Sequence, residues 1–256
     1  APAGKKEPPR EPPLLYDLTA LQKEANVRHG FSADKTLSIA QSLYEKKVTS
    51  YPRTGSRYIS DDVFEIIPDR IRLLTSYPRF AAYAATLDGQ LLNSRSVNAA
   101  KVTDHHALLV TENLPGDLSP DERTIYEMIA ARVLESFSAK CLMERTAVTL
   151  QSAGVAFSVR GSIIRVPGWR SVLNLPDEDE EYNATLPELH EGDSLPIYNS
   201  EALEKQTKPR PLHTESTLLA AMESAGRELE IEERHRHPCH PCRHYRDIVQ
   251  PQLHPP

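Results

Sequence analysis

Cysteine, tryptophan and long apolar runs are scarce in this sequence of 256 residues, which holds 3 cysteines and 1 tryptophan. Cys141 stands far from Cys239 and Cys242, so we expect no disulfide framework of the kind that small secreted domains use. No apolar run approaches the ~20 residues of a membrane-spanning helix, and no signal peptide is recognisable. These absences favour a cytoplasmic protein without a membrane partner.

A surplus of positive charge is also missing, because the formal net charge is −6. The composition therefore argues against a protein covered in basic patches, although local charge is what decides nucleic-acid binding. Acidic residues cluster at 177–181, whereas Lys46, Lys47, Arg53 and Arg57 lie close together in sequence. Those four residues, taken alone, favour a solvated face over a binding surface.

The distribution of proline and apolar residues predicts an α+β fold in several parts. Residues 1–13 resemble a Pro-rich linker without an initiator methionine, so we expect a central piece of a longer protein. Residues 14–141 show mainly helical periodicity, and 142–208 are richer in alternating β-formers. Residues 209–233 begin a further helical domain.

Capping residues set the expected helix ends. Gly30 should end a helix over 19–29, Ser32 should open one to about 45, and Ser119 should open a long one. Ser60 should begin a helix that ends at Pro68. Thr214 should begin another helix, which ends at Gly226. Further predicted elements are a helix at 80–87 and strands at 145–152, 155–160, 162–166, 193–198 and 202–208, with Gly161 separating two of them.

The segment 50–58 combines a phenol and a guanidinium across a proline. Pro52 pushes Tyr51 toward extended geometry, in which residues i and i+2 point to the same side. Tyr51 and Arg53 should therefore face one pocket, where a tyrosine oxygen could attack a phosphodiester and a guanidinium could hold the phosphate oxygens. A turn with one half-buried tyrosine would satisfy the same spacing.

Four stretches of the chain form a recognisable set: residues 49–58 (TSYPRTGSRY), 21–22 with 30–32, 101–108 (KVTDHHAL) and 208–215 (KPRPLHTE). Together they resemble the type IA DNA topoisomerases, and within them the topoisomerase III group. The resemblance implies part of an arch-shaped fold: a helical domain with the catalytic tyrosine and part of a β-rich hinge domain. It also implies an enzyme that cuts one DNA strand, passes another through the gap and reseals without ATP.

By this resemblance Tyr51 is the nucleophile, which forms a 5′-phosphotyrosine link, and Arg53 stabilises charge on the phosphate. His105 matches the family histidine that contacts the phosphate region of bound DNA. Lys101, Arg57 and His106 are weaker candidates for DNA contacts. The expected partner is DNA, chiefly single-stranded, in the nucleoid, and the alternative is a single-stranded-DNA-binding module in which Tyr51 is structural.

Two departures from the family pattern qualify the resemblance. Gly55 stands where the family often has Asp, which puts in doubt one interaction near the tyrosine. The family's Mg²⁺-binding acids, and the glutamate that protonates the leaving 3′ oxygen, belong to a Toprim domain that no stretch here resembles. We therefore expect no metal ligands in this chain, dependence on the rest of the parent enzyme, and no useful cleavage by the chain alone.

Residues 234–256 differ abruptly in composition, with Cys239, Cys242 and several histidines. These residue types suit zinc, but no apolar partner segment accompanies them. Permitted codons for 234–242, read one nucleotide later, encode Gly-Ile-Gly-Thr-Pro-Ala-Thr-Arg. That string resembles the family's next segment, so we predict a frameshifted, non-native tail, with a zinc module as the alternative.

Overall fold

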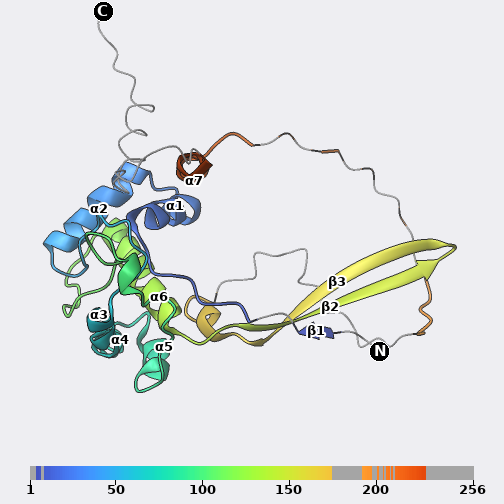
Figure 1. Cartoon of the computed structure of the whole chain (residues 1–256), viewed down its shortest axis with the longest axis horizontal. Helices are drawn as coiled ribbons and strands as arrows, with labels where there is room; N and C mark the ends of the chain where they lie inside the picture. Colours follow the sequence, from blue (N-terminus) through green and yellow to red (C-terminus); the bar gives the residue numbers. More distant parts are fainter. Residues whose placement is uncertain are drawn as a thin grey trace, which may run out of the picture. The chain divides into compact units, whose positions relative to one another are not determined.

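The computed structural model describes residues 4–6, 9–174, 192–197, 201, 204, 206–207, 209 and 211–228. Contacts divide the chain into two compact units, one of residues 1–11 and 140–212 and one of residues 12–139 and 213–256. The described part of the first unit contains an antiparallel sheet, and that of the second is mainly helical (Figure 1). The fold is thus mixed α+β.

The helices of the second unit follow the predicted pattern closely. Asp17 accepts a hydrogen bond from the Ala20 N–H at the start of the first helix, and Gly30 ends it with φ 67°. Ser119 and Glu122 form a reciprocal capping box at the start of the longest helix. The helices are α1 (Leu18–His29), α2 (Ala33–Glu45), α3 (Asp61–Glu65), α4 (Ile67–Leu74), α5 (Ala81–Leu87), α6 (Pro120–Phe137) and α7 (Glu215–Glu228), with a 3-10 turn η1 (Ala99–Lys101).

Two predicted helix ends were wrong. Pro68 lies in the first turn of α4, which begins after the break at Ile66. Backbone N–H groups in a first turn have no partner within the helix, so a proline, which lacks the N–H, is compatible with the start of a helix. Gly226 lies inside α7, which continues to Glu228. An internal glycine costs a helix only about 1 kcal/mol relative to alanine, which neighbouring residues can offset.

Helix α6 forms the centre of the helical unit and packs against α1 and α2. Its apolar residues from Ile125 to Phe137 are almost fully buried. Arg132 is buried among them and bonds to Glu24 of α1, to Glu135 at 3.0 Å, and to the Tyr16 hydroxyl at 3.1 Å. This paired charge network joins α1, α6 and the segment before α1. Burial raises the pKa of the Glu135 carboxyl to about 6, although Arg132 opposes the shift.

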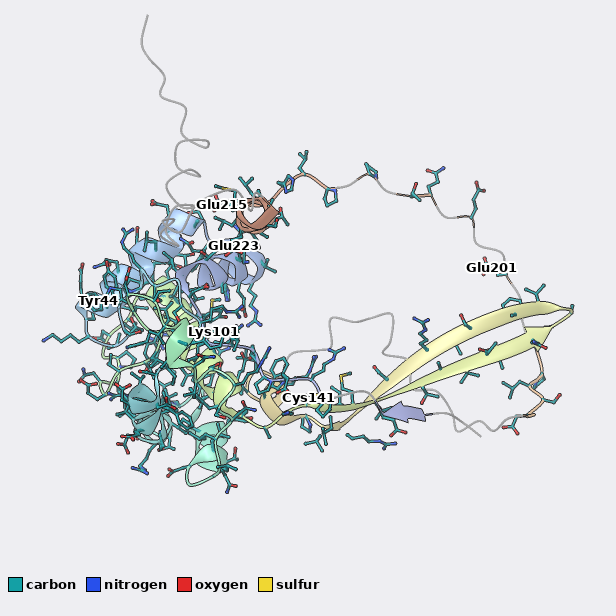
Figure 2. The ribbon with its side chains drawn as sticks, viewed as in Figure 1. Tyr44, Lys101, Cys141, Glu201, Glu215 and Glu223 are labelled. Carbon is teal, nitrogen blue, oxygen red and sulfur yellow. The ribbon has the colours of Figure 1, made fainter. Side chains whose placement is uncertain are left out.

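Helix α7 packs against α1 through several polar contacts and one buried leucine, Leu219. Glu223 forms an ion pair of 2.8 Å with Lys23 of α1. Glu215 accepts the backbone N–H of Ala33, the first residue of α2, at 2.7 Å (Figure 2 labels both glutamates). A carboxylate at this place complements the positive end of the α2 dipole.

The sheet has the order β1-β2-β3, with every neighbouring pair antiparallel. A tight turn joins its two long strands, and Ala153 and Gly154 both have positive φ there (49° and 82°), as a type I′ hairpin requires. Gly161 does not separate two strands as predicted, because it pairs with Thr146 inside one continuous strand. The strands are β1 (Gly4–Lys6), β2 (Leu142–Ser152) and β3 (Val155–Val166), followed by the turn η2 (Gly168–Ser171).

Several other predictions concern segments that the structure describes partly or not at all. Residues 192–197 contain no strand, so the strand predicted at 193–198 is wrong over that range. The strand predicted at 202–208 lies mostly outside the described residues, and the acidic run 177–181 and the tail 234–256 lie wholly outside them. Within the described part of the chain, no helix has the length and apolar character needed to cross a membrane.

Candidate active site

Residues 50–58 (the tyrosine segment) and residues 101–108 (the histidine segment) lie side by side in the helical unit, although they are far apart in sequence. Ser50 donates its N–H to the Leu109 carbonyl, and its hydroxyl accepts the Leu109 N–H, both at 2.9 Å. Thr49 forms an antiparallel bridge with Val110, and the Ala107 N–H bonds to the Tyr58 carbonyl at 2.9 Å. These bonds fix both ends of the segment that carries Tyr51.

The Tyr51 ring is half-buried and contacts two other rings. The His105 ring lies 4.7 Å away between centroids, tilted by 55°. The Tyr44 ring, from the last turn of α2, lies 5.3 Å away and meets Tyr51 edge to face at 76°. The structure therefore brings Tyr51 and His105 together, and it adds Tyr44, which lies outside the motifs predicted from the sequence.

Two buried hydroxyls hold the backbone between Tyr51 and the histidine segment. Thr54 donates its hydroxyl to the His105 carbonyl at 3.0 Å and accepts the Ser56 N–H at 3.1 Å. Ser56 in turn donates to the Lys101 carbonyl at 2.9 Å. Both side chains are only 2% exposed, so these bonds are shielded from water. They attach the residues after Tyr51 directly to the backbone of two predicted DNA-contact residues.

The two arginines of the segment have different surroundings. Arg53 is exposed, and no carboxylate pairs with it among the residues that the structure describes. Arg57 is half-buried and donates Nε–H to the Leu15 carbonyl at 3.1 Å. Burial raises the pKa of the neighbouring Asp17 carboxyl, while the Ala20 N–H and the Arg57 charge oppose that shift. Arg57 thus serves the packing before α1, and Arg53 presents its guanidinium to solvent.

Lys101 and His106 lie near the ends of the histidine segment. Lys101 is exposed, with Nζ 3.4 Å from the Tyr58 hydroxyl and 4.8 Å from the centre of that ring. His106 is half-buried, and its Nδ1 lies 2.7 Å from the Ala107 carbonyl, so the proton of the neutral ring belongs on Nδ1 in this arrangement. Nε2 of His106 then remains as an acceptor.

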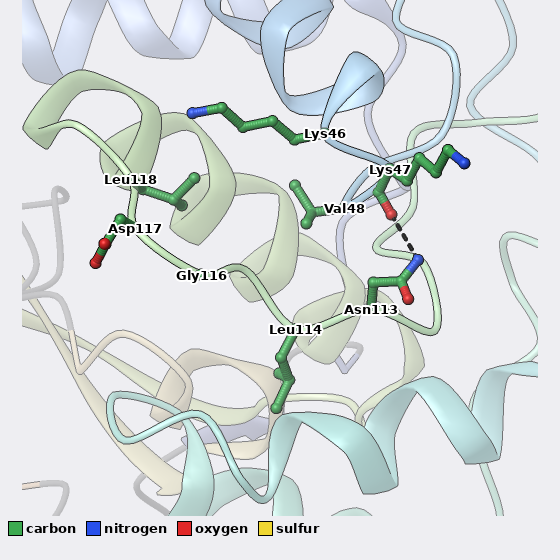
Figure 3. Close-up of a pocket in the computed structure, with 8 residues that line it drawn as sticks. All are labelled: Lys46, Lys47, Val48, Asn113, Leu114, Gly116, Asp117 and Leu118. Carbon is green, nitrogen blue, oxygen red and sulfur yellow. Dashed lines mark hydrogen bonds between the residues drawn. The ribbon is translucent and has the colours of Figure 1, made fainter.

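A shallow pocket of about 430 Å³ lies beside the start of the tyrosine segment (Figure 3). Lys47, at its rim, has the left-handed φ of 60°, and its carbonyl accepts a bond from the Asn113 amide at 3.0 Å. Lys46 forms an ion pair of 2.6 Å with Glu122, which holds the pKa of that carboxyl down to about 2. The residues that line the pocket are Lys46, Lys47, Val48, Asn113, Leu114, Gly116, Asp117 and Leu118.

Lys46 is therefore paired with Glu122, the acidic residue of the α6 capping box, and its charge is already neutralised. Asp117 and Glu122 also balance the two lysines, so the pocket carries no surplus of positive charge. The basic character that the sequence suggested around Tyr51 is reduced in the folded chain to Arg53, Lys47 and the exposed Lys101.

The part of the chain that the structure describes offers no group of three or more His, Cys, Asp or Glu side chains placed to hold a metal ion. Cys141 is buried, and its backbone pairs with Arg10. Cys239 and Cys242, which raised the possibility of zinc, lie outside the described residues. The described side chains therefore do not fit a Mg²⁺ site.

Tyr44 and the pair Thr54–Ser56 are the site residues that sequence reasoning missed. Tyr44 lies within the helix predicted to run to about residue 45, where no separate role was predicted for it, and its side chain is 41% exposed. Thr54 and Ser56 counted as parts of a motif without roles of their own. The sequence signal that could have indicated Tyr44 was its place, as an aromatic residue at the end of a predicted helix just before the tyrosine segment.

Comparison with known proteins identifies the class to which this fold and site belong. A profile of the family described as DNA topoisomerase matches residues 3–227. The chain also matches the structure of full-length topoisomerase I from Thermotoga maritima with a TM-score of 0.65, at 23% sequence identity, over 96% of this chain and 40% of that one. The chain belongs to the type IA DNA topoisomerase family.

Within that family the chain is similar to bacterial proteins named DNA topoisomerase 3. It is 40% identical to the protein from Bacillus licheniformis over 230 residues, and 38% identical to that from Bacillus subtilis (strain 168) over 231 residues. Each match covers 87% of this chain and 32% of the relative, so the chain spans about a third of the length of these proteins.

Proposed function

We propose that this chain is the tyrosine-bearing part of a topoisomerase III that cuts and reseals one DNA strand through Tyr51. In cleavage the phenol oxygen forms a bond to phosphorus, and the bond from phosphorus to the 3′ oxygen breaks. The phenol gives up its proton and the leaving 3′ oxygen takes one up. Resealing reverses these steps, so the energy of the phosphodiester is kept in the phosphotyrosine and no ATP is needed.

The observation that carries this proposal is the position of the half-buried Tyr51 ring beside the His105 ring. The hydrogen bond from the Thr54 hydroxyl to the His105 carbonyl fixes the backbone that carries both residues. A nucleophile must be held close to its line of attack, because loss of orientation is costly in rate. The two motifs that carry the family resemblance are therefore neighbours in space. If Tyr51 only stabilised a turn, the histidine segment would not need to lie against its ring.

The exposed guanidinium of Arg53 suits the phosphate on which Tyr51 acts. A guanidinium can donate two parallel hydrogen bonds to phosphate oxygens, and it stabilises the charge that develops during attack. His105 would contact the same phosphate region, and Lys101 and His106 would contact the DNA backbone nearby. Arg57 is the weakest of these candidates, because its Nε–H is already bonded to Leu15.

Magnesium would be held by the Toprim domain of the parent enzyme, since the described residues do not fit it. When bound there, the ion would help to hold the phosphate. The residues of this chain would supply the nucleophile, its orientation and part of the grip on DNA. The proposed location is the bacterial cytoplasm, at the nucleoid.

Covalent trapping tests the proposal. The purified chain is mixed with a separately supplied Toprim domain, Mg²⁺ and labelled single-stranded DNA, and denatured at intervals. We expect a labelled protein–DNA adduct, with the 5′ phosphate on Tyr51 by mass spectrometry, that Tyr51→Phe abolishes. The matched control is Tyr83→Phe on α5, which should leave the adduct unchanged.

The competing function is a non-catalytic single-stranded-DNA-binding module, which the exposed basic side chains near Tyr51 would also permit. That function predicts binding of the labelled strand that Tyr51→Phe does not change, and no adduct under any condition. Binding with no adduct in the complemented mixture would therefore favour the module over the enzyme.

A further inference from the structure

We propose that Tyr44 is a positioning residue for Tyr51, which holds the ring of the nucleophile through an edge-to-face contact. The inference rests on the proposed function, because it gives the contact a role in orienting the attacking oxygen. Tyr44 lies on α2 rather than in either of the motifs that carry the family resemblance (Figure 2).

The contact has the geometry of a specific aromatic pair. The ring centroids are 5.3 Å apart and the planes meet at 76°, which lets the positive edge of one ring face the negative surface of the other. Ordinary core packing does not explain Tyr44, because its side chain is 41% exposed. Among the described residues, the ring that Tyr44 contacts is that of Tyr51, and this contact would restrict the Tyr51 ring.

Several hydrogen bonds hold the end of α2 that carries Tyr44. The Tyr44 carbonyl accepts the Lys47 N–H at 2.8 Å, where the chain turns left-handed. Ser42 and Lys46, on either side of Tyr44, both donate to one carboxylate oxygen of Glu122, at 2.7 and 2.6 Å. A side chain can orient a neighbour only if its own position is defined, and these bonds define it.

A single ring contact would leave Tyr51 free to swing about its side-chain torsions. The His105 ring, at 4.7 Å and 55°, limits one direction, and the Tyr44 ring limits another. With both rings present, the phenol oxygen of Tyr51 is kept at one place before DNA arrives. Removal of the Tyr44 ring should therefore slow bond formation to phosphorus while the grip of Arg53 on the phosphate remains.

The first test needs no DNA. A fluorinated tyrosine is placed at position 51 of the full chain, and its ¹⁹F resonance is compared with that of the urea-unfolded chain. Ring currents from Tyr44 and His105 should displace the folded resonance. We expect Tyr44→Leu to move it toward the unfolded value and Tyr44→Phe to leave it in place. Tyr83→Leu is the control for a general loosening of the helical unit. Identical resonances for the parent, Tyr44→Phe and Tyr44→Leu would overturn the proposal.

The second test measures the rate of adduct formation and the affinity for labelled oligonucleotide separately, in the complemented mixture. Tyr44→Leu should slow adduct formation about 3- to 10-fold, the range expected for one aromatic pair, with unchanged affinity, and Tyr44→Phe should restore the rate. A loss of affinity with a normal rate would instead make Tyr44 a stacking surface for a base and overturn positioning. If the parent chain forms no adduct, the proposed function fails, whatever the ¹⁹F result shows about the ring.

Discussion

Among Lys46, Arg53 and Arg57, Arg53 is the residue that is exposed without a carboxylate partner in the described part of the chain. Lys46 is bound to Glu122, and Arg57 donates to the Leu15 carbonyl. Sequence proximity alone grouped these residues into one basic cluster. In the folded chain, Lys46 and Arg57 bond to other residues of the protein, whereas the Arg53 side chain is exposed to solvent.

Arg53→Ala should weaken binding of single-stranded DNA and make it less sensitive to salt. Each phosphate neutralised on a single strand contributes about 0.7 to the slope of log K against log salt, so the slope should fall by about that amount. Fluorescence anisotropy across a salt series measures it. Arg72→Ala, which removes an exposed side chain paired with Asp69 and Asp88, is the control and should keep the slope. An unchanged slope in Arg53→Ala would contradict the phosphate contact.

At the scale of the elements, Glu122 joins the end of α2 to the start of α6. One of its oxygens accepts the Ser119 N–H in the capping box, and the other accepts Ser42 and Lys46. Its side chain is only 13% exposed, so the ion pair is partly shielded from solvent. A capping residue thus also fixes the part of α2 that carries Tyr44.

Glu122→Gln should lower the free energy of unfolding by about 1 kcal/mol near pH 6. The folded-state pKa of Glu122 is about 2, below the ordinary 4.5, so its stabilisation is complete above pH 4.5 and is lost as pH falls toward 2. The difference between parent and variant should therefore shrink with acidification, which urea unfolding at pH 6 and pH 3 measures. Glu112→Gln is the control, because its carboxylate is 68% exposed. A difference that stays constant with pH would refute this account.

At the scale of the whole molecule, the chain covers about a third of the length of related topoisomerases. The described residues hold a nucleophile candidate and an exposed guanidinium, but no cluster that suits a metal ion. In the proposed mechanism the metal and the acid for the leaving oxygen come from the Toprim domain. The tyrosine-bearing part would therefore be necessary for the reaction but not sufficient.

The isolated chain should not relax negatively supercoiled DNA in the presence of Mg²⁺. Agarose gels of the topoisomers over time measure this, with a complete topoisomerase as the positive control. A ladder of relaxed topoisomers from the purified chain alone, which disappears in Tyr51→Phe, would show that this chain contains a complete active site.

Local sequence was enough to predict where α2 and α6 begin and where α1 ends, because Ser32 and Ser119 accept backbone N–H groups only a few residues away and Gly30 adopts a left-handed conformation. It also determined the motif that carries Tyr51. Such signals are local, so they can be read without the fold. The predictions at Pro68 and Gly161 were wrong because proline can lie at the end or in the first turn of a helix, and glycine can lie between strands or inside one. Neighbouring helices or a paired strand decide which structure forms.

The surroundings of Tyr51 depend on contacts between distant parts of the chain. The bond from Thr54 to the His105 carbonyl spans 51 positions of sequence, and Glu122 reaches Lys46 across 76. Contacts of this kind depend on how α2, α6 and the two loops pack, which no local pattern encodes. The sequence indicated the nucleophile candidate, and packing determined which rings contact it and which nearby cations remain exposed.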